Sequence, residues 1–182
     1  EQLDNLPPAL ELPTDRPRPL GVQTYKGDRA ALMLPKELNI ALNQLSHKQG
    51  VTLFMTLLTA FEILLHRYCG QEDLLINFAS AGRAQIETER LIGFFSNTLL
   101  LRANLAGNPT FRQLLNRVRE SSLAAYAHQD LPFEKLIEGL PLEDRQARSS
   151  LFQIKFALNP PWSNGRGMAS VQLPDLSFTS LF

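Results

Sequence analysis

The sequence predicts an α/β domain, a two-layer sandwich in which helices cover a mixed β-sheet. Three observations lead to this fold class. Helix-like and strand-like runs intermingle along the 182 residues, with pairs of helices between strands. Residues 53–68 are apolar on nearly every side, as expected of a helix that is buried all round. Residues 151–158 alternate apolar and polar side chains, which is typical of a half-buried strand.

The composition excludes several classes of partner. Lysine plus arginine and aspartate plus glutamate both number 18, so no net charge attracts nucleic acid or anionic lipid. No basic run with interleaved aromatic residues is present either. The most apolar stretch, residues 51–65, carries Glu62 and is too short to span a bilayer. We therefore expect a protein that binds neither nucleic acid nor a membrane.

The single cysteine and the first residues indicate the compartment. Cys69 has no partner for an internal disulfide, which fits a reducing cytoplasm. The start of the chain, "EQLDNLPPALELP", lacks the basic and apolar regions of a secretory signal. We expect a cytoplasmic protein in which Cys69 is a small apolar residue at a helix end.

Proline dominates the first part of the chain. Prolines stand at positions 7, 8, 13, 17 and 19, and each removes a backbone donor and keeps the preceding residue extended. Residues 1–21 are therefore predicted to be a linker that lies on the surface. Residues 27–35, "GDRAALMLP", then resemble a strand that stops at Pro35.

Two helices and a strand are predicted next. Apolar positions at helical spacing indicate an amphipathic helix that ends at Gly50. Thr52 is a suitable cap for the second helix, 53–68, and Gly70 is a natural stop. The apolar run "DLLINFA" at 73–79 predicts a strand covered on both faces.

A second strand and a long helix follow. Residues 96–105, "SNTLLLRANL", predict the strand. Thr110 with Gln113 fits a capping box at the start of a helix that extends to about residue 127.

The last part of the chain mixes short elements and loops. Pro132 begins a short helix that ends at Gly139. Beyond the strand at 151–158, residues 160–170 are rich in glycine, proline and serine and predict a loop. Residues 175–182, "DLSFTSLF", predict a final strand.

The three histidines are the first candidates for a general base, because histidine titrates near neutral pH. His47 lies on the polar side of its helix, and His66 lies on the buried helix. His128 ends a helix two residues before Asp130, where it can interact with the helix dipole; a catalytic role for it stays open. No two histidines have helical metal-ligand spacing, and no metal site is predicted. The residues alone indicate an α/β domain without a self-evident catalytic set.

Four stretches in order resemble the condensation domain of non-ribosomal peptide synthetases. "IGFFSNTLLLR" (92–102) is similar to the motif I-G-x-F-V-N-T-x-x-x-R, with Ser96 in place of valine. "HQDLPFEKLIE" (128–138) matches H-Q-D-x-P-F-E-x-L-V/I-E. "ARSSLFQIKFALN" (147–159) resembles R-D-x-S-R-x-P-L-F-Q-V-x-F, although its first part is eroded. "ELPTDRPRP" (11–19) looks like the linker that follows the family's first lobe.

The resemblance implies the C-terminal lobe of such a domain. It implies a chloramphenicol-acetyltransferase-like lobe at residues 22–182, preceded by an interlobe linker at 1–21. The family's catalytic signature, H-H-x-x-x-D-G, belongs to the first lobe, and this sequence has no His-His pair. We therefore expect that the N-terminal lobe is absent, that no residue of this chain is the catalytic one, and that the chain is inactive alone.

The resemblance also implies the reaction and the partners. A condensation domain joins an acyl or peptidyl donor to an aminoacyl acceptor, both carried on the phosphopantetheine arms of carrier proteins. No cofactor is expected on the chain itself. The expected partners are the missing lobe, carrier-protein and adenylation domains, or a second copy. Two alternatives stay open within the resemblance: a non-catalytic half-domain that docks a carrier protein or dimerises, and a sister domain that epimerises or cyclises. A self-sufficient acyltransferase using His128 is the third.

Site residues follow from the resemblance by matched position. Asn97 would lie nearest the reaction cleft, where it could hydrogen-bond a substrate or pantetheine amide, and Gly93 would allow close backbone approach. Arg83 and Gln153 are further cleft candidates. A structural role is expected for the motif that leads into the short helix, namely for His128, Gln129, Asp130, Pro132 and Phe133.

Overall fold

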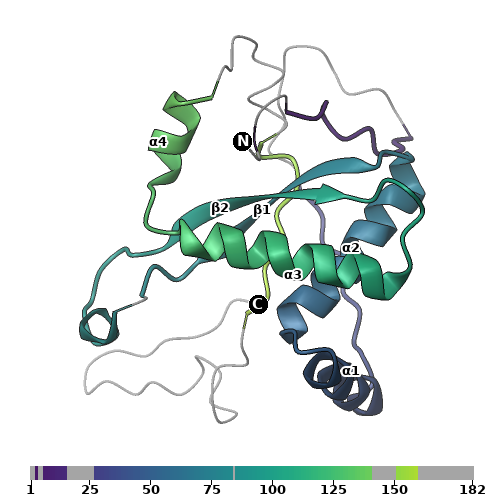
Figure 1. The fold of residues 1–182 in the computed structure, drawn as a ribbon, viewed down its shortest axis with the longest axis horizontal. Helices are drawn as coiled ribbons and strands as arrows, with labels where there is room; N and C mark the ends of the chain where they lie inside the picture. Colours follow the sequence, from purple (N-terminus) through teal and green to yellow (C-terminus); the bar gives the residue numbers. More distant parts are fainter. Residues whose placement is uncertain (1–2, 4–5, 16–26, 84, 141–150, 160–182) are drawn as a thin grey trace.

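A computed structural model describes residues 3, 6–15, 27–83, 85–140 and 151–159. The predicted loop at 160–170 and the predicted strand at 175–182 lie outside these residues, as does part of the predicted linker. In the described part, helices pack on a small β-sheet, which confirms the α/β class (Figure 1).

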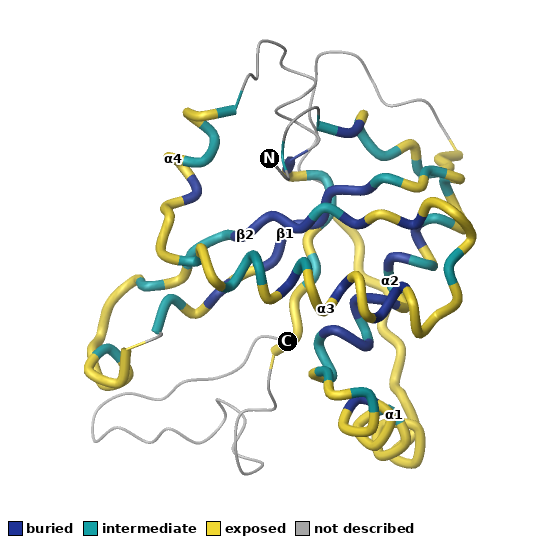
Figure 2. Tube along the Cα trace, viewed as in Figure 1, coloured by how far each residue is buried: buried dark blue, intermediate teal, exposed yellow. Residues whose placement is uncertain are grey.

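The first two helices lie where the sequence predicts them. α1 spans Lys36–Lys48 and α2 spans Leu53–Cys69. The Thr52 hydroxyl accepts the backbone N–H of Met55 at 3.2 Å and caps α2, while Gly70 ends it in the left-handed conformation at φ 72°. Only one α1 residue is fully buried, so this helix covers the edge of the domain (Figure 2).

Within the described residues, the sheet consists of two antiparallel strands. β1, Asp73–Ser80, pairs with β2, Asn97–Asn104, from Asp73 opposite Asn104 to Ser80 opposite Asn97. The connection between them contains one short 3₁₀ helix, η1, at Ile86–Thr88. Both strands lie within one residue of the predicted positions.

The remaining helices begin and end as predicted. α3 spans Phe111–Ala127, and Thr110 and Gln113 form the expected capping box. α4 spans Phe133–Glu138 directly after Pro132. Figure 1 shows α3 running across the two strands, whereas α4 stands apart from the other helices.

Each face of the sheet has its own apolar cluster. On one face, α2 and α3 pack on alternate strand residues; this main core comprises Met55, Leu58, Leu65, Leu74, Ile76, Phe78, Leu99, Leu101, Ala103, Leu105, Leu114, Leu115 and Val118. On the other face, Leu75 and Leu100 pack with Phe133 of α4 and Leu151. The period-2 alternation of the strands therefore divides the domain into two layers of unequal depth.

Two predicted strands are corrected by the structure. Residues 27–35 form no ladder; Leu32 and Met33 are 87% and 92% exposed. A strand needs a neighbouring edge for its backbone groups, and this segment has none among the described residues. Residues 151–158 contribute one parallel bridge, between Lys155 and Asn77, instead of a full strand. Among the described residues, that contact is the one parallel pairing of the sheet.

No single helix in the described ranges has the length and apolarity needed to cross a membrane. α1 and α2 reach that length and composition only together, as a pair bent by 104°.

Candidate functional site

The two best-matching motifs meet where the β-hairpin faces the start of α4. Asn97 is the first residue of β2, and residues 128–132 connect α3 to α4. The Asn97 side-chain amide donates to the backbone carbonyls of Gln129 at 2.8 Å and Leu131 at 2.7 Å. Its Oδ1 accepts the backbone N–H of Phe133 at 3.2 Å and of Thr98 at 2.9 Å. One side chain thus holds the connection in place.

Asn97 also acts as a helix cap from a distant part of the chain. Pro132, at the N-cap position of α4, provides no capping side chain. The first helical N–H, that of Phe133, is instead accepted by Asn97, 36 residues earlier. A helix of only six residues has little intrinsic stability, so this contact and the burial of Phe133 fix where it lies.

Gln129 binds the end of the other strand. The Ser80 hydroxyl donates to Gln129 Oε1 at 2.6 Å, and it also accepts the backbone N–H of Gly82 at 3.3 Å. Ser80 and Asn97 are directly opposite each other in the hairpin register. One residue pair of the hairpin, Ser80 and Asn97, therefore hydrogen-bonds to Gln129 from both strands.

The loop between the strands closes on itself through Arg83. The Arg83 guanidinium lies 4.4 Å from the ring centroid of Phe95, a cation–π contact, and donates to the Thr88 carbonyl. Gly82 has φ 62°, and a Cβ there would lie 1.7 Å from the Phe95 carbonyl oxygen. Glycine is thus required where the loop backbone crosses itself.

Gly93 lies in the same loop beside the ring of Phe95. A Cβ at Gly93 would come within 2.9 Å of the Phe95 Cε2 atom, which is the far end of a side chain. The missing side chain at Gly93 therefore allows the Phe95 ring to lie close to the Gly93 backbone. Both residues belong to the same loop.

A pocket of about 360 Å³ opens between this loop and the connection to α4. Its lining brings together predicted and unpredicted residues, namely Gly82, Phe94, Phe95, Ser96, Asn97, Thr98, Gln129, Asp130, Pro132, Phe133 and Glu134. Phe94 is 92% exposed, and the carboxylate of Asp130 makes no hydrogen bond within the described residues. The pocket thus offers hydroxyl and carboxylate groups beside an exposed aromatic ring.

Gln153 lies away from this pocket and binds the N-terminal segment. Its Oε1 accepts the backbone N–H of Leu10 at 2.7 Å, and its Nε2 donates to the Leu10 carbonyl at 2.5 Å. Gln71 makes the same kind of contact next to it, since Oε1 accepts the N–H of Glu11 and Nε2 donates to the Ala9 carbonyl. Two glutamines therefore hold the described part of the proline-rich segment against the domain.

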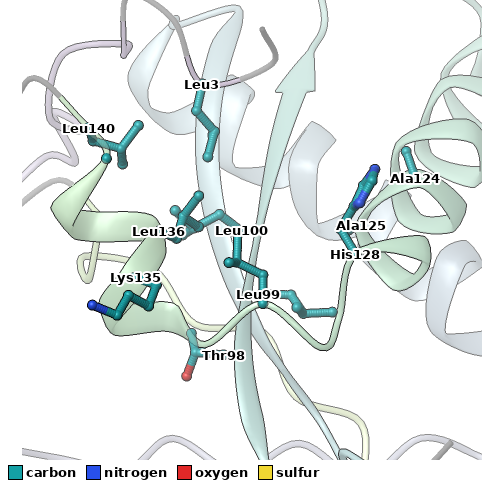
Figure 3. A pocket seen from close by; sticks show the side chains of 12 residues that line it. Leu3, Thr98, Leu99, Leu100, Ala124, Ala125, His128, Lys135, Leu136 and Leu140 are labelled. Carbon is teal, nitrogen blue, oxygen red and sulfur yellow. The ribbon is translucent and has the colours of Figure 1, made fainter.

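The His128 side chain lines a different pocket. This pocket, of about 690 Å³, lies between β2, the end of α3 and α4. Its lining is mostly leucine and alanine, with Lys135 as the other titratable group (Figure 3).

Glu62 is the one strongly shifted acid in the described part of the chain. It is fully buried on α2, and neither carboxylate oxygen has a hydrogen-bond partner there. Burial raises the pKa of Glu62 to about 8. No group of three or more histidine, cysteine, aspartate or glutamate side chains in the described ranges could hold a metal ion.

Sequence reasoning missed four residues. Ser80, Gly82, Gln71 and the unpaired carboxylate of Glu62 are all set by tertiary contacts. Ser80 and Gln71 are polar residues near the ends of a strand, and the sequence does not indicate their partners. Glu62 had one visible signal, a charge in the middle of a largely apolar helix.

Comparison with known proteins agrees with the resemblance of the sequence to condensation domains. The family model described as "Condensation domain" matches residues 1–180. A linear gramicidin synthase of Brevibacillus parabrevis is 53% identical over 175 residues, which is 96% of this chain but 3% of that protein.

Two solved structures share the fold. Holo-AB3403, a four-domain nonribosomal peptide synthetase bound to AMP and glycine, superposes with a TM-score of 0.79 at 26% identity, over 87% of this chain and 12% of that one. The X-domain of teicoplanin biosynthesis, in its complex with OxyB, superposes with a TM-score of 0.74 at 29% identity, over 85% of this chain and 34% of that one. The chain therefore spans a small part of the proteins it matches.

Proposed function

Since the chain belongs to the condensation-domain family, we propose that residues 22–182 are the C-terminal lobe of a domain that forms amide bonds. In the whole protein this lobe helps join an acyl or peptidyl donor to an aminoacyl acceptor, each tethered to a carrier protein. The observation that carries the proposal is the meeting of the two best-matching motifs at one pocket, through the bonds of Asn97 to Gln129 and Leu131.

The catalytic histidine, in this proposal, lies outside these 182 residues. The sequence contains three separate histidines and no His-His pair. His128 lines the other pocket, not the one that contains Asn97. The chain alone should therefore form no amide bond.

The pocket beside Asn97 suits part of a tethered substrate. Phosphopantetheine, when attached to a carrier protein, supplies the thioester that reacts. A narrow amide chain needs hydrogen-bond partners beside an apolar surface, and the pocket provides Ser96 and Asp130 next to Phe94. The partly negative lining also suits the amine of an aminoacyl acceptor.

We assign the predicted site residues different roles. Asn97 is a positioning residue, because its amide hydrogens and Oδ1 are used within the protein. Gly93 and Arg83 shape the loop that borders the pocket. Gln153 holds the linker segment, which would then enter the lobe at a fixed angle. As part of a synthetase, the lobe would work in the cytoplasm beside carrier-protein and adenylation domains.

Condensation assays on two chains test this function. Donor and acceptor carrier proteins loaded with aminoacyl-phosphopantetheine are mixed with the 182-residue chain or with a chain extended to the whole condensation domain. Mass spectrometry of the acceptor arm should detect a dipeptidyl thioester only with the extended chain. An amide product from the 182-residue chain alone would refute the proposal. If that product then disappeared in His128→Ala, the self-sufficient acyltransferase would replace it.

A second candidate is a docking module without catalysis. The favouring observation is that a structural relative, the X-domain of teicoplanin biosynthesis, was solved in complex with OxyB. If the extended chain binds a loaded carrier protein in titration calorimetry but yields no dipeptidyl product, docking is the better description. An epimerised or cyclised product would instead indicate a sister domain.

A further inference from the structure

The N-terminal segment contacts both apolar clusters of the domain. Leu3 and Leu6 pack against the smaller cluster, which is the one that contains Phe133 of α4. Leu10 and Leu12 pack against the main core, on the opposite face of the sheet. The segment therefore passes from one face of the sheet to the other. We call Leu3 and residues 6–12 the N-terminal strap.

Two side-chain amides fix one end of the strap. Gln153 hydrogen-bonds to both backbone groups of Leu10. Gln71 hydrogen-bonds to the Ala9 carbonyl and to the Glu11 N–H. Each amide supplies one donor and one acceptor, as a neighbouring backbone would. The backbone of the strap is therefore held at a fixed place on the domain near Leu10.

Two consecutive prolines join the two ends of the strap. Pro7 and Pro8 stand between Leu6 and the residues that the glutamines hold. A proline ring fixes φ at about −65°, and consecutive prolines make a stiff, extended segment. Pro7 is also buried, so one of the two rings is packed in the domain. The position of the strap at Leu10 therefore limits where Leu6 lies.

The smaller cluster also holds α4 on the sheet. Phe133 is one of its buried members, and the strap leucines pack against the same buried members as Leu136, Ile137 and Leu140. In Figure 3, Leu3 faces the same pocket as Leu136 and Leu140. A helix of six residues has little stability of its own. The place of α4 therefore depends on an apolar cover to which the strap contributes.

The start of α4 borders the pocket that contains Asn97. Pro132, Phe133 and Glu134 line this pocket. The Phe133 N–H is also the group that Asn97 Oδ1 accepts at 3.2 Å. One wall of the pocket therefore shifts whenever the start of α4 shifts.

We propose that the N-terminal strap is a positioning element of the candidate site. Leu3 and Leu6 hold α4 on the sheet, and α4 holds one wall of the pocket beside Asn97. No described residue of the strap lines that pocket, so the strap acts on it through α4. The effect on substrate binding rests on the proposed function, in which this pocket receives a tethered substrate. The effect on α4 does not depend on it.

Hydrogen exchange of the α4 amides tests the strap in a chain extended to the whole condensation domain. The double variant Leu3→Ser/Leu6→Ser removes apolar cover from the smaller cluster. Exchange in residues 133–139 should accelerate at least about tenfold, because α4 then opens more often. The double variant Leu3→Met/Leu6→Met keeps the apolar volume and should exchange as the wild type does.

Leu12→Ser is the matched control within the strap. It makes the same chemical change at a leucine that packs against the main core instead of the smaller cluster. The α4 amides should therefore keep their wild-type exchange in this variant. Slow exchange within α3, Phe111–Ala127, reports in every variant that the domain is folded.

A variant outside the smaller cluster tests whether the strap acts as one piece. Among the described residues, the side-chain amide of Gln71 bonds only to Ala9 and Glu11. Gln71→Ala should therefore accelerate exchange in α4 about threefold, because the loosened strap holds Leu6 less firmly. Gln44→Ala, on the exposed face of α1, should leave α4 unchanged.

Condensation kinetics test the effect of the strap on the substrate. With loaded carrier proteins as substrates, Leu3→Ser/Leu6→Ser should raise KM at least about threefold and change kcat less, because a displaced pocket wall weakens binding. Leu12→Ser should leave both constants near the wild-type values. A loss of folded protein alone would lower the apparent kcat and leave KM unchanged.

Several results would overturn the proposal. The α4 amides could exchange at the wild-type rate in Leu3→Ser/Leu6→Ser, or accelerate equally in Leu12→Ser. Unchanged exchange in Gln71→Ala would show that the glutamines do not hold Leu6 in place. A loosened α4 with an unchanged KM would show that the strap does not position the pocket. If the extended wild-type chain forms no dipeptidyl product, the proposed function fails, while the exchange rates still decide whether the strap holds α4.

Discussion

The side-chain amide of Asn97 donates to the backbone carbonyl of Gln129 at 2.8 Å, and this bond joins the start of β2 to the turn between α3 and α4. Gln129 in turn accepts from Ser80 at the end of β1. The hairpin and the short helix are therefore connected through a small polar network in addition to the apolar contact of Phe133 with Leu75 and Leu100. Each member can be tested separately.

Asn97→Ala should destabilise the domain by about 2–4 kcal/mol, because four hydrogen bonds are lost and carbonyls of the turn are left without a donor. Urea unfolding monitored by circular dichroism measures the change. Asn43→Ala is the matched control, since Asn43 is exposed and bonds only to Asn39 within α1. Equal stability of the two variants would show that the hydrogen bonds of Asn97 do not stabilise the turn.

Gly82→Ala should destabilise the loop by about 2 kcal/mol or more, because the added Cβ collides with the Phe95 carbonyl and φ is positive. Thermal unfolding measures the loss. Gly27→Ala, where nothing lies within 4 Å of the added Cβ, should change stability little. A neutral Gly82→Ala would mean that the loop can adopt another path.

Glu62 should make the protein less stable as the pH rises. Its pKa is about 8 in the folded state and near 4.5 when unfolded, so between these values the unfolded state loses a proton that the folded state keeps. Below pH 4.5 both states are protonated, and above pH 8 both are ionised. Within the window, the free energy of unfolding attributable to Glu62 falls by about 1.4 kcal/mol per pH unit.

Glu62→Gln removes this dependence. Urea unfolding at several pH values from about 5 to about 8.5 should show a smaller decline in the variant than in the wild type. Glu120 is an exposed residue of α3 that lines, together with Glu62, a pocket of about 540 Å³. Glu120→Gln should keep the wild-type slope. Identical slopes for wild type and Glu62→Gln would show that the carboxylate is solvated.

Gln153→Ala should release the segment around Leu10, because two backbone hydrogen bonds depend on that side chain. Proteolysis within residues 6–15 should accelerate roughly tenfold, as expected when about 1–2 kcal/mol of local protection is lost. Gln71→Ala should act in the same direction through Ala9 and Glu11. Gln44→Ala, on the exposed face of α1, is the control. If proteolysis also accelerated in this control variant, the cause would be global unfolding.

Local sequence patterns were sufficient for most elements. The helix limits follow from Thr52, Gly70 and the Thr110–Gln113 capping box, whose effects act within a few residues. The errors concern strands. Residues 27–35 have a strand-like composition but no edge to pair with among the described residues, and residues 151–158 reach β1 at one bridge only. Pairing depends on a neighbour distant in sequence, which a local pattern does not contain.

The features of the candidate site also fall into those that local sequence predicts and those that depend on tertiary contacts. The sequence alone determined the α/β class, the helices, the family resemblance and the segment 128–133 as a connection into a helix, because these rest on periodicity, capping and contiguous motifs. Tertiary contacts alone establish that Asn97 caps α4, that Gln153 binds Leu10, and that Asn97 and His128 line different pockets. The physical reason is that hydrogen bonds between distant segments depend on how the chain packs, and packing is a property of the whole molecule.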